Sequence, residues 1–417
     1  MLPQVKTKTQ KLAKYQEIIP GKLYQEIESL ARDFKGLKVA MINATPRGGG
    51  VAEILKSLVP LMKGIGIKAK WFVIPPGRKF FALTKEIHNA LQGKKFPLSF
   101  TSRRLYHRYM ERSAKLMLDM KADVWILHDP QPAGISQYLS DNDFHPLISR
   151  IHIDTTSPHP ETWNFIKGFL LQYDKIIFSS KEFVHPDIPH KKSVIVPPAI
   201  DPFTEKNRPL ALAKAKIILK SFGINPQKPL VAQVSRFDPW KDPVGVIQAY
   251  RHAKKKIPNL QLALVGLFLA YDDPEAMKIF RETKKEVRGD KDIFLFSNPE
   301  QLGSLSVDRF VNAFQTGADV ILQKSIREGF GLSVTEAMWK GKPVIGGNVG
   351  GIKLQIKDGK NGFLVSSPQE AGERIVELMK EAKLREKLGK AARKTVREKF
   401  LMPRLLRDYL RLFKELL

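Results

Sequence analysis

The sequence contains no cysteine, which excludes disulfide bonds and thiolate ligands for a metal ion. It also contains no run of about 18 apolar residues, so it predicts no membrane-spanning helix. The first residues lack the apolar stretch of a secretory signal peptide. We therefore expect a cytoplasmic protein without a membrane partner.

Acidic side chains are few compared with basic ones: 42 Asp and Glu against 70 Lys and Arg, a net charge of +28. Such a charge attracts phosphate-rich ligands, from nucleotides to nucleic acid, although a hydrated basic surface also accounts for it. The sequence has no zinc-finger spacing and no aromatic run of the RNA-binding kind, so we expect no nucleic-acid partner. Many Lys and Glu residues without cysteine are typical of heat-adapted proteins.

A chain of 417 residues is too long for one hydrophobic core, and two domains are expected. Short runs of Val, Ile, Leu and Phe alternate with segments of helical spacing, and most lack the strict alternation of half-exposed strands. Strands of this kind are buried in parallel sheets that helices cover on both faces. The sequence therefore predicts an α/β protein with two parallel-sheet domains and a cleft between them. The predicted strands are Leu37–Asn43, Ala69–Ile74, Asp123–His128, Ser149–Asp154, Lys175–Ser179, Ser193–Val196, Pro229–Ser235, Gln261–Val265, Ile293–Phe296, Asp319–Gln323, Pro343–Gly346 and Phe363–Val365.

The domain boundary is expected in the proline-rich segment 196–202, because proline interrupts regular structure and suits a hinge. The domains would span residues 1–201 and 202–400. Residues 401–417 carry apolar side chains at helical spacing, which predicts a C-terminal helix that packs back on the N-terminal domain. The first 35 residues have the pattern of a charged amphipathic helix.

The most informative motif follows the predicted strand 319–323. It places Glu328 in a glycine-bearing loop and Glu336 in a helix that begins between them. Gly331 allows the backbone to approach a ligand, and the helix start at Leu332 and Ser333 offers N–H groups to phosphate oxygens. This layout suits a site for a sugar and a diphosphate, with Glu328 on sugar hydroxyls and Glu336 on a ribose.

Two cations follow the predicted strand 229–235. Arg236 offers a planar guanidinium and Lys241 a point charge, and both can meet a diphosphate. They would neutralise the charge that develops as a nucleoside diphosphate departs. Taken alone, they are equally well two surface cations on a loop.

Three predicted strand ends in the first half carry further candidates. Gly49 and Gly50 form a glycine turn that can approach phosphate or sugar, or that simply joins a strand to a helix. Asp129 can bind acceptor hydroxyls or cap a helix. His152 can bind a sugar hydroxyl, although a single histidine between Ile151 and Ile153 is also typical of a core.

The sequence predicts no metal site. Asp141-Asn142-Asp143 has the D-x-D form of some manganese-dependent transferases, but it reads as a polar turn away from any strand end. The histidines show no HExxH spacing and have no cysteine partners. Gly350 and Gly351 are expected to let the chain pass close to donor phosphates.

Taken in order, these segments resemble the family-four GT-B glycosyltransferases, retaining enzymes with a nucleotide-sugar donor. The resemblance rests on Gly48–Val51, the strand end at His152, Ser235-Arg236 with Lys241, the block from Glu328 to Glu336, and Gly350-Gly351 with Asp358–Gly362. Within that family, R-I-H-I-D-T-T-S-P at 150–158 and K-S-I-R-E-G-F-G at 324–331 resemble archaeal nucleotide-sugar-dependent trehalose synthases and the related trehalose phosphorylases.

The resemblance implies the GT-B fold, with two Rossmann-like domains: an N-terminal one for the acceptor and a C-terminal one for the nucleotide sugar. It implies glucose transfer from a nucleoside-diphosphate glucose to free glucose, which yields α,α-trehalose without a metal or other cofactor. Arg236 and Lys241 would then bind the diphosphate, Glu328 and His152 the donor glucose, and Asp129 the acceptor. The donor's remaining contacts would come from Gly49, Gly50, Gly331, Leu332, Ser333 and Glu336.

Several points stay open at the level of sequence. A trehalose phosphorylase, or a transferase with another sugar or a lipid acceptor, has the same fold. A homodimer is possible, and the preferred base of the nucleotide is not encoded in a recognisable motif. Glu328 and Glu336 belong to one loop–helix element, so we do not expect them to lie on opposite sides of a bond as glycosidase carboxylates do.

Overall fold

A computed structural model describes residues 1–75, 77–139, 144–267 and 274–417. The chain divides into two units, residues 1–199 with 401–417 and residues 200–400. The division falls within the proline-rich segment, two residues before the expected position, and the C-terminal helix belongs to the first unit. The D-x-D segment, Asp141 to Asp143, lies outside the described residues.

The first unit is built on a seven-stranded sheet of order β1-β3-β2-β4-β5-β6-β7. All neighbouring strands in it are parallel except β1, which pairs antiparallel with β3. The strands are β1 (Gln4–Val5), β2 (Lys38–Asn43), β3 (Lys68–Val73), β4 (Val124–His128), β5 (Leu147–Ile151), β6 (Lys175–Phe178) and β7 (Ser193–Ile195). The helices are α1 (Gly21–Asp33), α2 (Gly49–Gly64), α3 (Arg78–Leu91), α4 (Phe100–Met117), α5 (Pro130–Ala133), α6 (Pro160–Leu170) and α15 (Met402–Leu416), with 3-10 turns η1 (Leu12–Tyr15), η2 (Gly134–Tyr138), η4 (Lys181–Phe183) and η5 (His190–Lys192).

The second unit is built on a six-stranded, fully parallel sheet of order β10-β9-β8-β11-β12-β13. The strands are β8 (Leu230–Val234), β9 (Gln261–Val265), β10 (Ile293–Phe296), β11 (Val320–Gln323), β12 (Val344–Gly347) and β13 (Phe363–Val365). The helices are α7 (Leu212–Ser221), α8 (Pro243–Lys254), α9 (Pro274–Val287), α10 (Val307–Gly317), α11 (Leu332–Trp339), α12 (Gly350–Gln355), α13 (Pro368–Lys380) and α14 (Ala382–Lys399), with η6 (Pro239–Lys241) and η7 (Pro299–Leu302).

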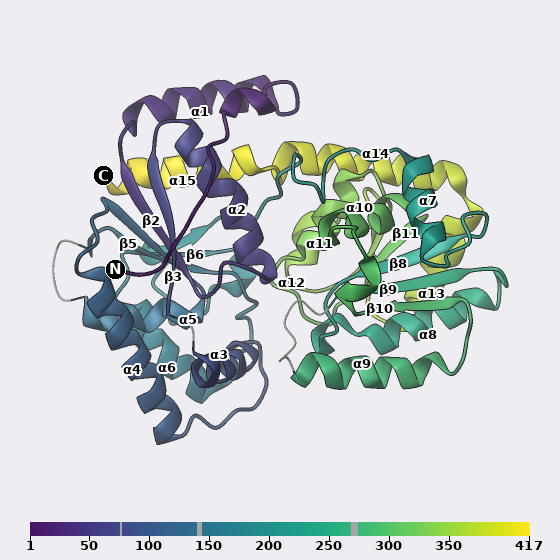
Figure 1. The fold of residues 1–417 in the computed structure, drawn as a ribbon, viewed down its shortest axis with the longest axis horizontal. Coiled ribbons are helices and arrows are strands. Elements are labelled where there is room, and N and C mark those ends of the chain that lie inside the picture. Colours follow the sequence, from purple (N-terminus) through teal and green to yellow (C-terminus); the bar gives the residue numbers. More distant parts are fainter. Residues whose placement is uncertain (76, 140–143, 268–273) are drawn as a thin grey trace. The chain divides into compact units, whose positions relative to one another are not determined.

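Helices cover both faces of each sheet, as Figure 1 shows. In the first unit, α1, α2 and α15 lie on one face and α3 to α6 on the other. In the second, α7, α10 and α11 lie on one face, and α8, α9 and α13 on the other. The predicted α/β class with two parallel-sheet domains is confirmed, and the parallel strands are mostly apolar because both of their faces are covered.

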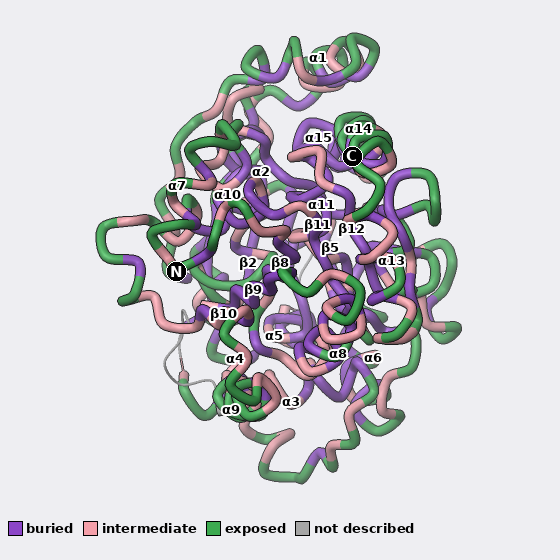
Figure 2. The backbone as a smooth tube through the Cα atoms, turned by 90° about the vertical axis from the view of Figure 1, so that its right-hand side faces the viewer, coloured by how far each residue is buried: buried purple, intermediate pink, exposed green. Residues whose placement is uncertain are grey.

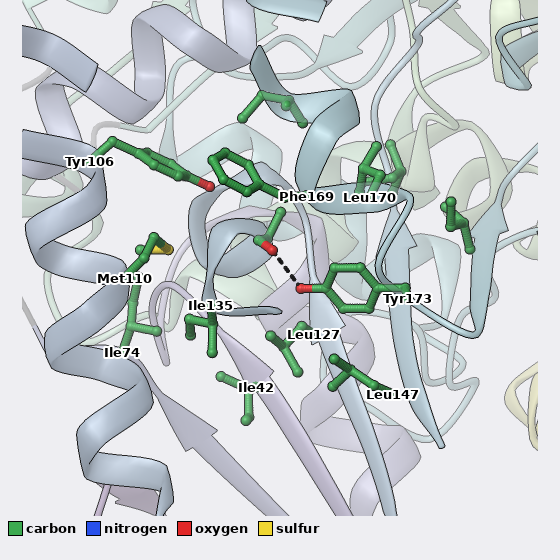
Figure 3. Close-up of a cluster of buried hydrophobic side chains, with 14 of the residues drawn as sticks. Ile42, Ile74, Tyr106, Met110, Leu127, Ile135, Leu147, Phe169, Leu170 and Tyr173 are labelled. Atoms are coloured by element: carbon green, nitrogen blue, oxygen red, sulfur yellow. Dashed lines mark hydrogen bonds between the residues drawn. The ribbon is translucent and has the colours of Figure 1, made fainter. Parts of the chain in front are cut away.

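The core of each unit runs along its sheet, where the backbone in Figure 2 is almost continuously buried. In the first unit, strand residues such as Ile42 and Leu127 pack against Met110 of α4 and Phe169 of α6 (Figure 3). Tyr173 is also fully buried there, and its hydroxyl donates to the main-chain oxygen of Ala133 at 2.7 Å. This bond removes the cost of burying a phenol in an apolar cluster.

Two expectations about the first unit need correction. The first 35 residues are not one amphipathic helix, because β1 and η1 precede α1, and β1 adds an antiparallel edge to the sheet. Strand β5 also ends at Ile151 rather than Asp154. Two hydrogen bonds explain this: the main-chain N–H of His152 donates to the side chain of Asp129, which is distant in sequence, and Asp154 accepts from the Thr156 N–H in a turn.

Among the described residues, no helix is both long enough and apolar enough to cross a membrane.

Candidate active site

The strand order of the second sheet reverses between β8 and β11, which are neighbours although β9 and β10 separate them in sequence. At such a point the loops after the two strands diverge to opposite faces and leave a crevice beyond the carboxyl ends. The loop after β8 carries Arg236 and Lys241, and the loop after β11 carries Glu328. Both predicted clusters therefore follow the two strands at which this sheet would bind a ligand.

Lys241 and Glu328 form an ion pair, with Nζ 2.5 Å from Oε2. Glu328 is 7% exposed, and the hydroxyl of Ser325 donates to the same carboxylate oxygen at 3.1 Å. With Oε2 held by two donors, the carboxylate has a fixed orientation. A buried charge pair of this kind is strongly coupled, because removal of one partner leaves the other uncompensated.

Buried polar groups fix the two loops to each other. Gln233, inside β8, donates to the main-chain oxygen of Lys241 at 3.1 Å and accepts from the Lys324 N–H at 3.3 Å. The Trp240 carbonyl accepts from the Ile326 N–H at 2.9 Å. Lys324, 5% exposed, forms an ion pair with Asp242, the residue that caps α8. These contacts hold the loop of Lys241 and the loop of Glu328 in fixed positions relative to each other.

Two glycines shape the Glu328 loop. Gly331 has φ 85°, a left-handed conformation that favours glycine, and it precedes α11. Gly351 donates its N–H to the Glu328 carbonyl at 2.9 Å, and a Cβ at Gly351 would lie 2.3 Å from the Cα of Phe330. We expected glycine at position 351 because of donor phosphates, but the close contact with Phe330 already requires glycine there.

Helix α11 begins directly after this loop, and no side chain among the described residues caps it. The N–H groups of Leu332 and Ser333 lie in its first turn, where an anion is favoured by the helix dipole. The Ser333 hydroxyl donates to the Gln323 side chain at 3.1 Å, so it is bound within the protein. The predicted contribution of Ser333 is consequently its backbone.

Glu336 lies one turn into α11 and is 6% exposed. Its Oε2 accepts from Gln315 Nε2 at 3.0 Å, and its Oε1 lies 3.8 Å from Lys206 Nζ. The contacts of Glu336 are therefore separate from those of the ion pair. Gln315 on α10 was not recognised in the sequence; the only signal was a glutamine among apolar residues of an amphipathic helix.

Arg236 occupies a more open position than Lys241. Its side chain is 59% exposed, and Nη2 lies 3.2 Å from Asp238 in the same loop. The structure thus brings Lys241 and Glu328 together, whereas Arg236 pairs with a neighbour in its own loop.

The strand order of the first sheet also reverses, between β2 and β4. Gly49 and Gly50 follow β2 and form the first residues of α2, and Gly49 has φ 80°. Both glycines are exposed, and a Cβ at Gly49 would meet nothing within 4 Å. Backbone conformation, not close packing, is therefore what requires glycine at position 49.

Asp129 and His152 follow the neighbouring strands β4 and β5 and contact each other. Asp129 Oδ1 accepts from the main-chain N–H of His152 at 2.8 Å. Asp129 stands at the N-cap position of α5, as the alternative prediction had it, but its side chain makes no capping hydrogen bond to that helix. Its backbone has φ 68° and ψ 175°, a region that is essentially restricted to glycine and costs a non-glycine residue about 1–3 kcal/mol.

The imidazoles of His128 and His152 are stacked, with Nδ1 of His128 3.0 Å from Nε2 of His152. Nε2 of His128 lies 3.5 Å from the sulfur of Met41, which can only accept, so the tautomer with the proton on Nε2 is the one that uses both contacts of this ring. Nδ1 of His128 then accepts from Nε2–H of His152. This arrangement leaves Nδ1 of His152 as a hydrogen-bond acceptor.

Burial sets the protonation of these groups. It lowers the pKa of both His128 and His152 well below the ordinary value, and the Arg150 guanidinium lowers it further. Burial also raises the pKa of the Asp129 carboxyl to about 7, although the His152 N–H and Arg150 both act to lower it. A strained residue with a strongly raised pKa at a strand end is a functional-site candidate on physical grounds.

Among the residues that the structure describes, no three His, Asp or Glu side chains gather as ligands of a metal ion would.

Comparison with known proteins identifies the family. The family described as trehalose synthase, N-terminal domain, matches residues 41–185, and the family described as glycosyl transferases group 1 matches residues 215–395. The chain is 44% identical to the trehalose synthase of Pyrococcus horikoshii over 407 residues, 97% of this chain and 96% of that protein. It is 27% identical to the trehalose phosphorylase of Pleurotus pulmonarius, over 85% of this chain but 54% of that protein.

A solved structure of sucrose-phosphate synthase from Thermosynechococcus elongatus matches the fold with a TM-score of 0.71 at 18% identity, covering 91% of this chain and 99% of that chain. The fold and the family resemblance predicted from the motifs are both confirmed. This chain belongs to the trehalose synthase family of glycosyltransferases, with the GT-B fold of two Rossmann-like domains.

Proposed function

We propose that this trehalose-forming glycosyltransferase moves glucose from a nucleoside-diphosphate glucose to free glucose and retains the anomeric configuration. The observation that carries the proposal is the ion pair of Lys241 and Glu328 at the strand-order reversal of the second sheet. It supplies one cation for a diphosphate and one fixed carboxylate for sugar hydroxyls within a single crevice. The second unit then binds the donor.

The diphosphate leaves with growing negative charge, which must be stabilised for the glycosidic bond to break. Lys241 is the fixed cation, and Arg236, exposed on the same loop, can leave Asp238 and approach the phosphates when a donor binds. The uncapped start of α11 at Leu332 and Ser333 provides backbone N–H groups for phosphate oxygens. With this charge supplied by the protein, transfer should not depend on an added metal ion.

Glu328 holds the hydroxyls of the donor glucose, and Glu336 holds the ribose. Binding a sugar at Glu328 uses the carboxylate oxygen Oε1, since Oε2 already accepts from Lys241 and Ser325. Nδ1 of His152 accepts from a sugar hydroxyl, in agreement with the protonation order deduced above. Gly49 and Gly50 leave the backbone after β2 open to a ligand, because both are exposed.

Asp129 binds the acceptor glucose. Its Oδ1 is engaged by the His152 N–H, which leaves Oδ2 for an acceptor hydroxyl. A carboxyl with a pKa of about 7 can both donate and accept hydrogen bonds near neutral pH. The acceptor proton passes to the departing phosphate on the same face of the sugar, so the reaction rests on positioning and charge stabilisation and not on a protein nucleophile.

The proposal is tested by a product assay. The protein is incubated with glucose and either UDP-glucose or ADP-glucose, and the disaccharide is analysed by NMR and for reducing power. The expected product is non-reducing α,α-trehalose. Glu328→Gln, which keeps the shape of the side chain but removes its charge, should lower the rate at least about tenfold while circular dichroism stays unchanged.

A parallel incubation with trehalose and phosphate, without any nucleotide, distinguishes the phosphorylase alternative. Release of glucose 1-phosphate there, together with no transfer from either nucleotide sugar, would show that the proposed donor is wrong. A reducing disaccharide would show that the acceptor or the linkage is wrong. Equal rates with and without EDTA are expected, and loss of activity with EDTA would contradict the charge-stabilising role of Lys241 and Arg236.

A further inference from the structure

Glu336 is held through a chain of two further side chains. Gln315, fully buried on α10, donates from Nε2 to Glu336 Oε2 at 3.0 Å. The other end of the same amide, Oε1, accepts from Lys340 Nζ at 2.8 Å. Lys340 lies four residues after Glu336, at the end of α11, so the three side chains form a relay between two packed helices.

The chemistry of the relay gives the amide a single orientation. A carboxylate can only accept hydrogen bonds, and the amine of Lys340 can donate them whether it is charged or neutral. Gln315 must therefore turn its oxygen toward Lys340 and its nitrogen toward Glu336. Lys340 also has the main-chain oxygen of Glu336 and Oδ1 of Asn207 at 3.4 Å each, so three acceptors surround its amine.

We propose that Lys340 is a positioning residue for the nucleotide: through Gln315 it fixes the Glu336 carboxylate so that Oε1 meets the ribose hydroxyls. This inference rests on the proposed function, in which Glu336 binds the ribose. With Oε2 engaged by Gln315, only Oε1, 3.8 Å from Lys206 Nζ, is turned to other partners. Lys340 itself touches no part of the donor.

The burial of Lys340 supports a functional reason for the residue. Burial lowers the pKa of Lys340 to about 7, while Glu336 raises it and Lys206 lowers it. Lys206 in turn lies 3.8 Å from Asp308 on α10. A methionine has a similar shape but cannot donate to the Gln315 oxygen, so the amine is what connects this position to Glu336.

Removal of Lys340 should loosen the relay. The Gln315 oxygen would lose its donor inside the protein, and the amide could rotate to place that oxygen against Glu336. The carboxylate would then turn, and the contact with the ribose would weaken. The donor's phosphates and glucose, bound by other residues, would be affected little.

The experiment measures how well the protein distinguishes a ribose from a sugar that lacks its hydroxyls. Dissociation constants are determined by calorimetry for UDP and ADP, each beside its 2′,3′-dideoxy form. For the unmodified protein, the better-binding nucleotide should bind at least about tenfold more tightly than its dideoxy form, because hydrogen bonds to a charged group are strong. In Lys340→Met and in Gln315→Met, that ratio should fall to about threefold or less.

Lys342→Met is the matched control. Lys342 is a second, partly buried lysine two residues away, and burial lowers its pKa as well, but the acidic group that acts on it is Asp319 and not Glu336. The ratio of dissociation constants should therefore stay at the value of the unmodified protein. If the loss of either lysine acted only through a general structural change, the ratio would fall in Lys340→Met and in Lys342→Met alike.

Each outcome has a separate meaning. A ratio near one in the unmodified protein would remove the ribose role of Glu336, whatever the product assay gives. A normal ratio in the unmodified protein that persists in both Lys340→Met and Gln315→Met would overturn the role of Lys340 alone. If Lys340→Met does not fold, Gln315→Met breaks the same relay; if neither variant folds, the relay is structural and the proposal is wrong.

Discussion

Replacement of Asp129 by asparagine should make this protein more stable and less active. Asp129 is buried, sits in a strained backbone conformation, and accepts a hydrogen bond from the His152 N–H. Asparagine has nearly the same shape and keeps that acceptor, but it carries no charge at any pH. The substitution therefore isolates the cost of ionising one buried carboxyl.

The magnitude follows from the pKa. Burial raises the pKa of Asp129 to about 7 from 3.8, so at pH 8 its ionisation costs up to about 4 kcal/mol relative to an ordinary carboxyl. The new amide N–H groups lose part of that gain if they stay unpaired, roughly 1–2 kcal/mol. We expect Asp129→Asn to be more stable by about 2–3 kcal/mol at pH 8.

The sign of the pH dependence is the sharper part of the prediction. Between pH 3.8 and about 7 the folded protein keeps a proton on Asp129 that the unfolded chain has released, so stability falls as pH rises through this range. In Asp129→Asn this contribution to the pH dependence of stability is absent. The difference between the two proteins should be small at pH 4 and largest at pH 8.

Urea unfolding at 25 °C, at pH 4, 6 and 8, measures this difference for both proteins. Asp123→Asn is the matched control. Asp123 directly precedes β4, the strand that Asp129 follows, and it likewise accepts one main-chain N–H, from Lys38 at 2.7 Å, but it is exposed. It should not reproduce the gain at pH 8. A difference in stability for Asp129→Asn that is the same at all three pH values would refute the reasoning. Transfer to glucose should fall at least about tenfold in the same variant, as loss of a charged acceptor ligand implies.

Three further outcomes follow from the second unit. Lys241→Met should weaken nucleoside diphosphate binding by about tenfold or more, measured by calorimetry, and unchanged affinity would mean that the ion pair does not serve the phosphates. Gly351→Ala should destabilise the protein by about 1–3 kcal/mol and slow transfer, because the added Cβ would lie 2.3 Å from the Cα of Phe330 and displace the Glu328 loop; an active, fully stable variant would contradict this. Between pH 7 and 10.5 the free energy of unfolding should rise with pH more steeply for the unmodified protein than for Lys340→Met, by up to about 1.4 kcal/mol per pH unit. The reason is that the unfolded chain still holds the Lys340 proton in this range, whereas the folded protein, in which the pKa of Lys340 is about 7, has lost it. Parallel curves of stability against pH would exclude the lowered pKa.

Much of the architecture could be predicted from the sequence for a simple physical reason. Strands covered by helices are mostly apolar, so short apolar runs between helical segments located β9, β10 and β13 to the residue. Strand β1 could not be predicted, because its two residues, Gln4 and Val5, are too few to show the alternation of a strand. The end of β5 was placed too late, because the residue that ends it is Asp129, far away in sequence, which takes the His152 N–H.

Candidate residues could be predicted where polar groups follow apolar strands, since ligands bind at the carboxyl ends of parallel strands. The sequence also identified the family, through the spacing between Glu328 and Glu336 and the position of Lys241 upstream. It could not show that Lys241 and Glu328 touch, because that contact depends on β8 and β11 being neighbours in the sheet.

The sequence by itself determined the fold class, the family and the set of polar side chains at the strand ends. The tertiary structure alone decided how those side chains are used, because burial and partners are properties of position and not of residue type. It separated Arg236, exposed beside Asp238, from Lys241, and it made Asp129 a strained carboxyl with a pKa near 7. It also joined Lys340 to Glu336 through Gln315, a relay between two helices that no local pattern encodes.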